Sequence, residues 1–336
     1  MSAAEAAIAD FARQIAALSG EVARPVCVDV ARVADRRGSL VLKPPGLWSP
    51  NRSCRMVRGA DGWIAVNLPR ETDRELVPAW LGVDSGADPW PAILAEARLR
   101  PWRRLVDDAR LLGLPVCGVG EVVAGSPEAP ARRMAEPNGR RRSGPLRVID
   151  LSAMWAGPLC GALLAGAGAE VIKVESRARP DALREASPAF FDRLNGGKRQ
   201  IEIDFDAAGL TALADEIAAA DVLITSARPR AFEQLGLTPE RLFARNPGLT
   251  WVVISGYGWL GEDADRVAFG DDAAAAGGLV RWIGRGEPRF TGDALADPLT
   301  GLAAAAGAFR AIRDGGGWLV DAALARTAAG VAAARP

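Results

Sequence analysis

Histidine is absent from the 336-residue sequence, and tyrosine occurs only once, at Tyr257. The lack of imidazole excludes catalytic Ser-His and Cys-His pairs, histidine zinc ligands and histidine general bases. Any covalent or proton-transfer chemistry therefore has to use carboxylates, lysine, cysteine, serine, the single tyrosine or backbone dipoles.

Cysteine, net charge and long apolar runs are also scarce. The four cysteines are far apart and form no CxxC pair, which indicates reduced core thiols in a cytoplasmic protein and predicts no metal site. The 41 basic residues balance the 41 acidic ones, so neither a nucleic-acid partner nor an anionic membrane surface is expected. The first residues lack the pattern of a signal peptide, and no apolar run is long enough to cross a bilayer.

What is present is the composition of a globular protein with a sizeable core, 49% hydrophobic and 24% charged. Proline, glycine and charged residues are concentrated at 124–145, which predicts a linker. We therefore expect a smaller α+β domain over residues 1–123 and a larger, nucleotide-binding domain over residues 146–336.

Residues 1–123 mix helical and strand patterns. Asp61-Gly62 supplies the turn geometry of a hairpin between two apolar runs. The expected strands are Cys54–Val57, Trp63–Leu68 and Pro115–Val119. The expected helices are residues 2–19, Glu71–Leu81 and Pro91–Leu112.

Residues 146–336 alternate short apolar strands with helices, which is the pattern of parallel βαβ units. The expected strands are Arg147–Leu151, Glu170–Glu175, Gln200–Asp204, Asp221–Thr225 and Leu249–Ser255. The expected helices are Gly157–Ala167, Ala207–Ala220, Arg230–Gln234, Pro239–Arg245, Asp272–Arg281 and Pro298–Arg313. The predicted fold class is α/β, with a Rossmann-like parallel sheet in the larger domain.

One hypothesis for this pattern is an NAD-linked enzyme, with Glu175 binding a ribose. However, the turn after the first strand reads Ser152-Ala-Met-Trp-Ala-Gly157-Pro158, without the GxGxxG that places glycines against a pyrophosphate. Gly166 and Gly168 lie at the far end of the helix, where glycine ends helices. Glu175 fits the polar end of a strand better than a ribose ligand.

Five segments of residues 146–336 are informative when they are taken together. They are VIDLSAMWAGPLCGALLAGAGAEVIKVE (148–175), LNGGKRQIEIDF (194–205), ADVLITSARPRAFEQLGL (220–237), NPGLTWVVISGYGWLG (246–261) and ADPLTGLAAAAGAFRAI (296–312). In their sequence, order and spacing they resemble the family III CoA-transferases, the formyl-CoA and carnitine CoA-transferase type. Residues 50–123 resemble the family's smaller domain, which ordinarily follows the catalytic aspartate. Here it precedes the nucleotide-binding part, so the chain resembles a circular permutant.

The resemblance implies that Asp297 is the nucleophile, because Asp297-Pro-Leu-Thr300-Gly301 matches the family's Asp-x-x-Thr-Gly context. Asp297 would attack an acyl-CoA thioester, form a mixed anhydride and then an aspartyl-CoA thioester, and pass CoA to a second carboxylic acid. An alternative role is the N-cap of the following helix, and the two roles are compatible. Asp293, on the preceding loop, is a second candidate.

The resemblance also places CoA across the carboxyl ends of the parallel strands. The implied CoA-binding residues are Trp155, Ala156, Ile203, Asp204, Ser226, Ala227, Arg228, Arg266, Val267 and Phe269. Core packing of the aromatic rings and solvent exposure of the two arginines are the alternatives. Lys198 fits either a phosphate contact or a structural ion pair.

Several positions depart from the family pattern. Thr225-Ser226-Ala227 replaces the usual Glu-Asn-Phe, and Ser176 and Gln234 stand where basic residues are usual. These changes motivate a second hypothesis, a non-catalytic acyl-CoA-binding relative. The racemase branch needs a histidine and is excluded. The resemblance further implies CoA thioesters and carboxylic acids as substrates, no tightly bound cofactor and a homodimer, while the sequence does not specify the acyl donor or acceptor.

Overall fold

The computed structural model describes residues 2–84, 86, 88–136 and 144–334, so part of the predicted linker lies outside the described residues. Two compact units combine segments that are far apart in sequence. The larger unit contains Met1–Ala34, Glu128–Asp265 and Pro298–Ala323, and the smaller unit contains Asp35–Pro127, Arg266–Asp297 and Leu324–Pro336. These units follow contacts in the folded chain, whereas the predicted domains follow sequence order, and the predicted boundaries stay a prediction.

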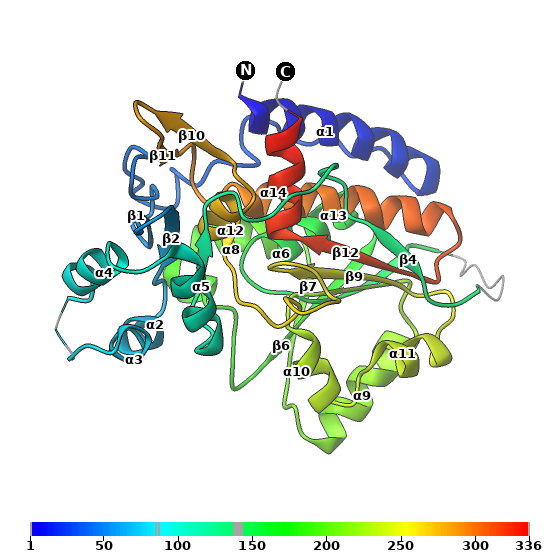
Figure 1. Ribbon diagram of the computed structural model, residues 1–336. Helices are drawn as coiled ribbons and strands as arrows, with labels where there is room; N and C mark the ends of the chain where they lie inside the picture. The colour runs from blue at the N-terminus through cyan, green and yellow to red at the C-terminus, as the bar shows by residue number, and fades with distance from the viewer. Residues whose placement is uncertain (1, 85, 87, 137–143, 335–336) are drawn as a thin grey trace. The chain divides into compact units, whose positions relative to one another are not determined.

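A seven-stranded sheet forms the centre of the larger unit (Figure 1). Its strands, in spatial order, are β4 (Ala131–Arg133), β12 (Trp318–Ala323), β9 (Thr250–Ser255), β8 (Val222–Thr225), β5 (Arg147–Leu151), β6 (Glu170–Ser176) and β7 (Arg199–Ile203). Every neighbouring pair is parallel except β12 and β4, which confirms the predicted α/β class. The strand order reverses at β5, whose neighbours are β6 and β8, and ligands bind at the carboxyl ends of strands at such a point.

Helices cover both faces of this sheet (Figure 1). Ile149 of β5 and Trp251 of β9 pack into an apolar core with side chains of α9, α10 and α11. The next residue, Asp150, points to the opposite face, where α6 passes so closely that a Cβ atom at Gly161 would lie 2.7 Å from its Oδ2. The helices of the larger unit are α1 (Ala3–Val22), α6 (Ala156–Gly166), α7 (Leu183–Ala186), α8 (Pro188–Asn195), α9 (Ala207–Ala218), α10 (Pro229–Gln234), α11 (Pro239–Arg245) and α13 (Ala296–Arg313), the first two residues of which belong to the smaller unit.

Two strands of the large sheet were not predicted. β4 lies within the stretch predicted as a linker, and it pairs antiparallel with β12 through Ala131 and Val320. β12 follows Gly315–Gly317, whose three residues all have positive φ. These glycines end α13 and turn the chain back into the sheet.

The smaller unit contains the predicted hairpin. β1 (Cys54–Arg58) and β2 (Trp63–Asn67) pair antiparallel, and β3 (Val116–Gly118) adds to β2. The Gly59 N–H donates to the Gly62 carbonyl at 2.8 Å, so the hairpin prediction is confirmed. The other elements of this unit are α2 (Glu71–Glu75), α3 (Val77–Leu81), α4 (Trp90–Ala97), α5 (Trp102–Leu111), α12 (Gly270–Ala276), β10 (Val280–Ile283), β11 (Glu287–Phe290) and α14 (Leu324–Ala333).

Two long predicted helices that fall in the smaller unit have other bounds, although one of them was expected in the larger domain. The helix predicted over Pro91–Leu112 is divided into α4 and α5, because Pro101 lacks a backbone N–H and lies just before α5. The helix predicted over Asp272–Arg281 is wrong at its end. α12 stops at Ala276, Gly278 turns the chain at φ 73°, and Arg281 lies in β10.

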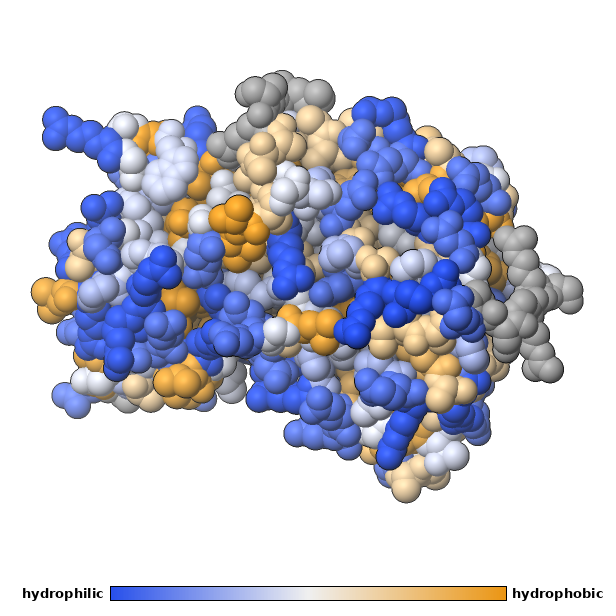
Figure 2. Space-filling model, turned by 45° about the vertical axis from the view of Figure 1, so that its right-hand side comes forward, coloured by the Kyte–Doolittle hydropathy of each residue, from blue (hydrophilic) through white to orange (hydrophobic). Residues whose placement is uncertain are grey.

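Hydrophilic side chains cover most of the face shown in Figure 2, and apolar side chains appear there in scattered groups. The exposed large apolar residues include Val41, Leu111 and Val123, which come from separate segments. Scattered exposure of this kind is ordinary for a folded chain. None of the helices in the described ranges combines the length and apolar character needed to cross a membrane.

Candidate active site

Asp297 lies in the first turn of α13, which begins one residue earlier, so it is not the N-cap of that helix. Its N–H donates to the Ala294 carbonyl oxygen at 2.9 Å. Ala294 is held in the left-handed region at φ 44°, which costs a non-glycine residue about 1 kcal/mol. The Asp271 carboxylate accepts the Ala294 N–H at 2.8 Å. A second aspartate therefore stabilises the strained turn that leads to Asp297.

The backbone of Gly270 approaches the Asp297 carboxylate closely. A Cβ atom at this position would lie 2.2 Å from Asp297 Oδ2 and 2.6 Å from the Ala294 oxygen, so only glycine fits without a shift of the turn. The Gly270 N–H donates to the Asp297 carboxylate. A backbone donor at this place can stabilise negative charge on the carboxyl oxygen.

Two further aspartates lie near Asp297, and Asn51 joins them. Asn51 Nδ2 donates to Asp271 Oδ2 at 2.7 Å and to Asp293 Oδ1 at 3.1 Å, and Arg36 Nε donates to Asp293 Oδ2 at 2.7 Å. Asp271 and Asp293 are 2% and 7% exposed, whereas Asp297 is partly exposed. Of these three residues, Asp297 alone is partly exposed, while Asp293, the second candidate nucleophile, is engaged by Arg36 and Asn51.

The surroundings of Asp297 disfavour its charge. Although part of the residue is exposed, its carboxyl group lies among protein atoms, and this burial raises the pKa of Asp297 to about 7. Arg36 opposes the rise, and Asp271 and Asp293 add to it by like-charge repulsion. Burial, again with repulsion from Asp293, raises the pKa of Asp271 to about 6. In the part of the chain that the structure describes, no group of three or more cysteine or acidic side chains could hold a metal ion.

Two groups of the predicted CoA-binding residues follow neighbouring strands of the larger unit. Trp155 and Ala156 come after β5, at the start of α6. Ser226, Ala227 and Arg228 come after β8. Because β5 and β8 pair in parallel, their carboxyl ends lie at the same edge of the sheet.

A hydrogen bond joins the turns after these two strands, since Ser226 Oγ accepts the Ala153 N–H at 3.0 Å. The Trp155 ring is buried and packs edge to face on Phe190, with ring centres 5.0 Å apart. The core-packing alternative therefore describes this ring, and its contact with CoA stays a prediction.

The remaining predicted residues are placed separately. Ile203 and Asp204 come at the end of β7, at the same sheet edge but two strands from β5. Arg266, Val267 and Phe269 belong to the smaller unit. The Arg266 guanidinium is buried in an ion pair with Glu121 at 2.5 Å, so the alternative of a solvated side chain is wrong for Arg266. Contact with CoA stays a prediction for all of these residues.

Comparison with known proteins identifies the family of this chain. The sequence pattern of CoA-transferase family III matches residues 145–336. This chain belongs to CoA-transferase family III. The succinyl-CoA–D-citramalate CoA-transferase of Chloroflexus aurantiacus is 36% identical over 190 residues, which are 52% of this chain and 47% of the relative. The formyl-CoA:oxalate CoA-transferase of Escherichia coli is 31% identical over 167 residues, 47% of this chain and 40% of the relative.

A solved structure of a CAIB/BAIF family protein from Brucella suis shares the fold, with 33% identity and a TM-score of 0.51. The match covers 55% of this chain and 54% of that chain. This family III chain spans about half the length of the curated relatives it matches. The predicted family is confirmed, and the circularly permuted order of its parts stays a prediction.

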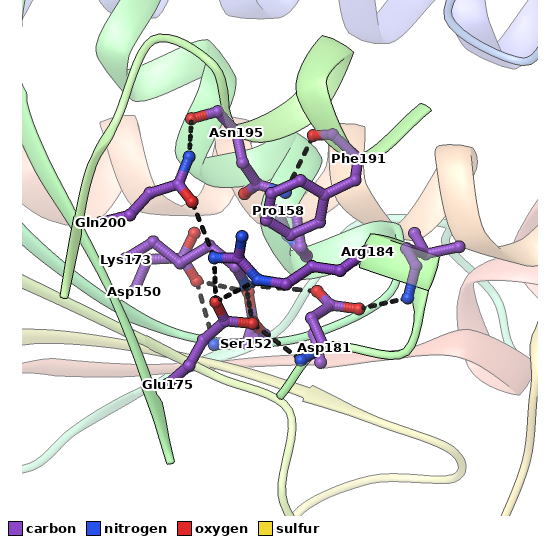
Figure 3. A network of polar contacts seen from close by, with 12 residues as sticks. Asp150, Ser152, Pro158, Lys173, Glu175, Asp181, Arg184, Phe191, Asn195 and Gln200 are labelled. Atoms are coloured by element: carbon purple, nitrogen blue, oxygen red, sulfur yellow. Dashed lines mark hydrogen bonds and ion pairs between the residues drawn. The ribbon is translucent and has the colours of Figure 1, made fainter. Parts of the chain in front are cut away.

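Sequence reasoning missed a buried charge network in this family III chain (Figure 3). Lys198 Nζ lies 2.8 Å from Asp150 Oδ2, which supports the structural ion pair over the phosphate contact considered for Lys198. Lys173, on the next strand β6, lies with its Nζ 3.2 Å from Asp181 Oδ2. Glu175 accepts the Asp181 N–H at 2.8 Å. Because its carboxylate already has protein partners, Glu175 does not support the hypothesis that it binds a ribose. The available signal was Lys173 itself, a charge between apolar residues of a strand expected to be buried.

Proposed function

We propose that this chain transfers CoA between carboxylic acids, with Asp297 as the covalent carrier. The observation that carries the proposal is the environment of Asp297. Asp297 is the partly exposed residue among three neighbouring aspartates, whose other two members are buried, and the Gly270 backbone N–H donates to its carboxylate. A carboxylate nucleophile is also consistent with a chain that contains no histidine.

The proposed reaction needs no co-reactant beyond the two substrates. The ionised Asp297 attacks the carbonyl carbon of the acyl-CoA, the C–S bond breaks, and a mixed anhydride and the CoA thiolate form. The thiolate attacks the aspartyl carbonyl, the first carboxylic acid leaves as its carboxylate, and an aspartyl-CoA thioester remains. The second carboxylate then attacks this thioester, and the same steps in reverse release the new acyl-CoA and Asp297.

Gly270 has a role in this scheme beyond leaving space. Whenever the thiolate or a carboxylate attacks the aspartyl carbonyl, negative charge develops on the oxygen beside the Gly270 N–H. A fixed donor in a site withdrawn from water stabilises such charge without reorganisation. The same enclosure that raises the pKa of Asp297 makes its ionised form a stronger nucleophile.

The relatives suggest the substrate class. Their names describe transfer of CoA from succinyl-CoA or formyl-CoA to small acids such as D-citramalate and oxalate. We extend this to the present chain as short acyl-CoA donors and small carboxylate acceptors, with no tightly bound cofactor. The proposal also includes three points that rest on the family resemblance alone. They are the permuted position of residues 50–123, a homodimer and a cytoplasmic location.

The test is covalent trapping. The protein is incubated with succinyl-CoA or formyl-CoA, treated with hydroxylamine or borohydride, digested and analysed by mass spectrometry. We expect a hydroxamate or a reduced side chain at Asp297, because both reagents attack an aspartyl thioester. The Asp297→Asn variant is the matched control. Incubated with succinyl-CoA and treated in the same way, it should give no adduct. CoA binding without an adduct at Asp297 would instead identify a non-catalytic acyl-CoA-binding protein.

The pH dependence gives a second prediction. Between about pH 6 and about pH 8, kcat/KM for the acyl-CoA is expected to rise roughly tenfold, because Asp297 with a pKa of about 7 changes from mostly protonated to mostly ionised. Activity is thus lost as the pH falls through this pKa. Asp271→Asn keeps an oxygen acceptor for the Ala294 N–H and removes a neighbouring negative charge, so its profile should move to lower pH. A wild-type profile that is flat over this range would contradict the assignment.

A further inference from the structure

The turn after β5 is fixed by side chains at each of its backbone N–H groups. The Ser152 N–H donates to Asp150 Oδ1 at 3.0 Å, and the Met154 N–H donates to Asp181 Oδ2 at 3.1 Å. The intervening N–H, that of Ala153, donates to the Ser226 hydroxyl as described above. All three donors of the turn therefore have acceptors from three different segments of the larger unit.

A carbonyl oxygen of the same turn also has a side-chain partner, and one residue of the turn has a strained backbone conformation. Lys173 Nζ donates to the Ser152 carbonyl oxygen at 2.8 Å. Met154 has φ 71°, a left-handed conformation that costs a non-glycine residue about 1 kcal/mol. Such a conformation persists only where the surroundings determine it. In this turn the determining groups include both halves of one ion pair, Lys173 and Asp181.

A buried ion pair is a costly way to fill a core. Lys173 and Asp181 are 0% and 4% exposed, and the desolvation of two such charges can exceed their attraction. In many proteins, apolar side chains of similar volume in place of a buried ion pair stabilise the fold equally well or better. What they could not do is donate to the Ser152 carbonyl and accept from the Met154 N–H. The ion pair therefore fixes the geometry of the turn, which an apolar replacement would not do.

A second buried ion pair, between Lys198 and Asp150, lies beside the turn. Lys198 Nζ contacts Asp150 Oδ2 and donates to the Pro158 carbonyl oxygen, each at 2.8 Å. Burial alone would raise the pKa of Asp150, but Lys198 and Lys173 lower it overall. Asp150 is therefore held as a charged acceptor, and the first turn of α6 is tied to the same network.

We propose that Lys173 and Asp181 are positioning residues for CoA. They hold Ser152–Met154 in the strained conformation from which Trp155 and Ala156 begin α6, and so set the shape of the CoA-binding turn. This inference rests on the proposed function, since it takes that turn as a CoA contact. Neither side chain has to touch CoA, because both act through the backbone of the turn.

The test replaces the ion pair without leaving a buried charge. The double variant Lys173→Met/Asp181→Leu should fold, with a lower thermal midpoint than the wild type because the Ser152 carbonyl and the Met154 N–H lose their partners. We expect its KM for the acyl-CoA to rise at least about tenfold while kcat at saturating acyl-CoA changes by less than about threefold, since the chemistry at Asp297 is untouched. Calorimetric titration with CoA should show the same loss of affinity. Asp181→Asn, which keeps an acceptor for Met154, should lose less than the double variant.

Controls separate the two proposals. Asp215→Leu/Arg245→Met removes an exposed ion pair of the same unit, 2.6 Å long, and should leave KM unchanged. If the wild-type protein binds CoA and gives the adduct at Asp297 but the folded double variant keeps its KM, this inference is overturned and the proposed function stands. If the double variant does not fold, the KM of the Asp181→Asn variant for the acyl-CoA is the deciding measurement. A value equal to that of the wild type overturns the inference. If the wild type neither binds CoA nor forms the adduct, both proposals fail together.

Discussion

Replacement of Asp297 by Asn is expected to lower the rate of CoA transfer by about 10³-fold or more. The amide cannot form the mixed anhydride, and no other carboxylate of the cluster can take over, because Asp271 and Asp293 are buried and hydrogen-bonded. Asn has nearly the same size and can still accept the Gly270 N–H. The measurement is the initial rate at saturating acyl-CoA together with the thermal midpoint.

Stability should move in the opposite direction to activity. Near pH 8 the wild type has an ionised Asp297 beside Asp271 and Asp293, and Asn removes that repulsion. The variant should therefore be at least as stable as the wild type at this pH. Asp314→Asn, an exposed position just beyond the other end of α13, is the matched control and should keep the full rate. A variant at Asp297 that retains more than about a tenth of the wild-type rate would remove the aspartate from the chemistry.

The buried parallel strands could be predicted because their sequences contain the signal. Arg147–Leu151 has the bounds found for β5, and the helix expected over Pro239–Arg245 is α11. Strands covered on both faces are short apolar runs, and prolines mark the starts of the intervening helices. β12 carried the same signal in the apolar run after Gly317, but the surrounding alanine-rich sequence favours helix and concealed it.

Asp297 could be proposed as the nucleophile from its sequence context, but the residues around it could not be predicted. Asn51 is 220 residues from Asp271 and 242 residues from Asp293 along the chain, and no local pattern records such a contact. The sequence also gives no sign of the left-handed turn at Ala294, because alanine is not a residue that favours that conformation. Its geometry depends on the Asp271 side chain, which the fold brings from the start of α12.

Gly270 shows the difference between what the sequence indicates and what only the structure reveals. The sequence shows a glycine before two aspartates but gives no reason for it, since a glycine at the start of a helix is ordinary. Only the structure shows that the missing Cβ leaves room for the Asp297 carboxylate. The requirement for glycine therefore comes from the candidate active site, and it can be tested by adding one methyl group.

Gly270→Ala is expected to lower kcat by about 10²-fold. The added Cβ would lie 2.2 Å from Asp297 Oδ2 and 2.8 Å from the Ala294 Cβ, so either the carboxylate or the strained turn has to move. A displacement of about 1 Å from the reactive geometry is enough for a loss of this size. Overpacking should also lower the free energy of unfolding by about 1–3 kcal/mol. Rates, trapping yield at Asp297 and thermal midpoints measure the three effects.

A loss of activity in Gly270→Ala has to be separated from a general loss of structure. Gly125→Ala, in a loop of the same unit where a Cβ atom would meet nothing within 4 Å, should keep both rate and stability. Adding Asp297→Asn to Gly270→Ala then distinguishes the two sources of the defect. If the methyl group acts by displacing the nucleophile, the double variant should be no slower than Asp297→Asn alone, because the affected step is already lost. A Gly270→Ala protein that folds and transfers CoA at the wild-type rate would show that this backbone does not meet the reacting carboxylate.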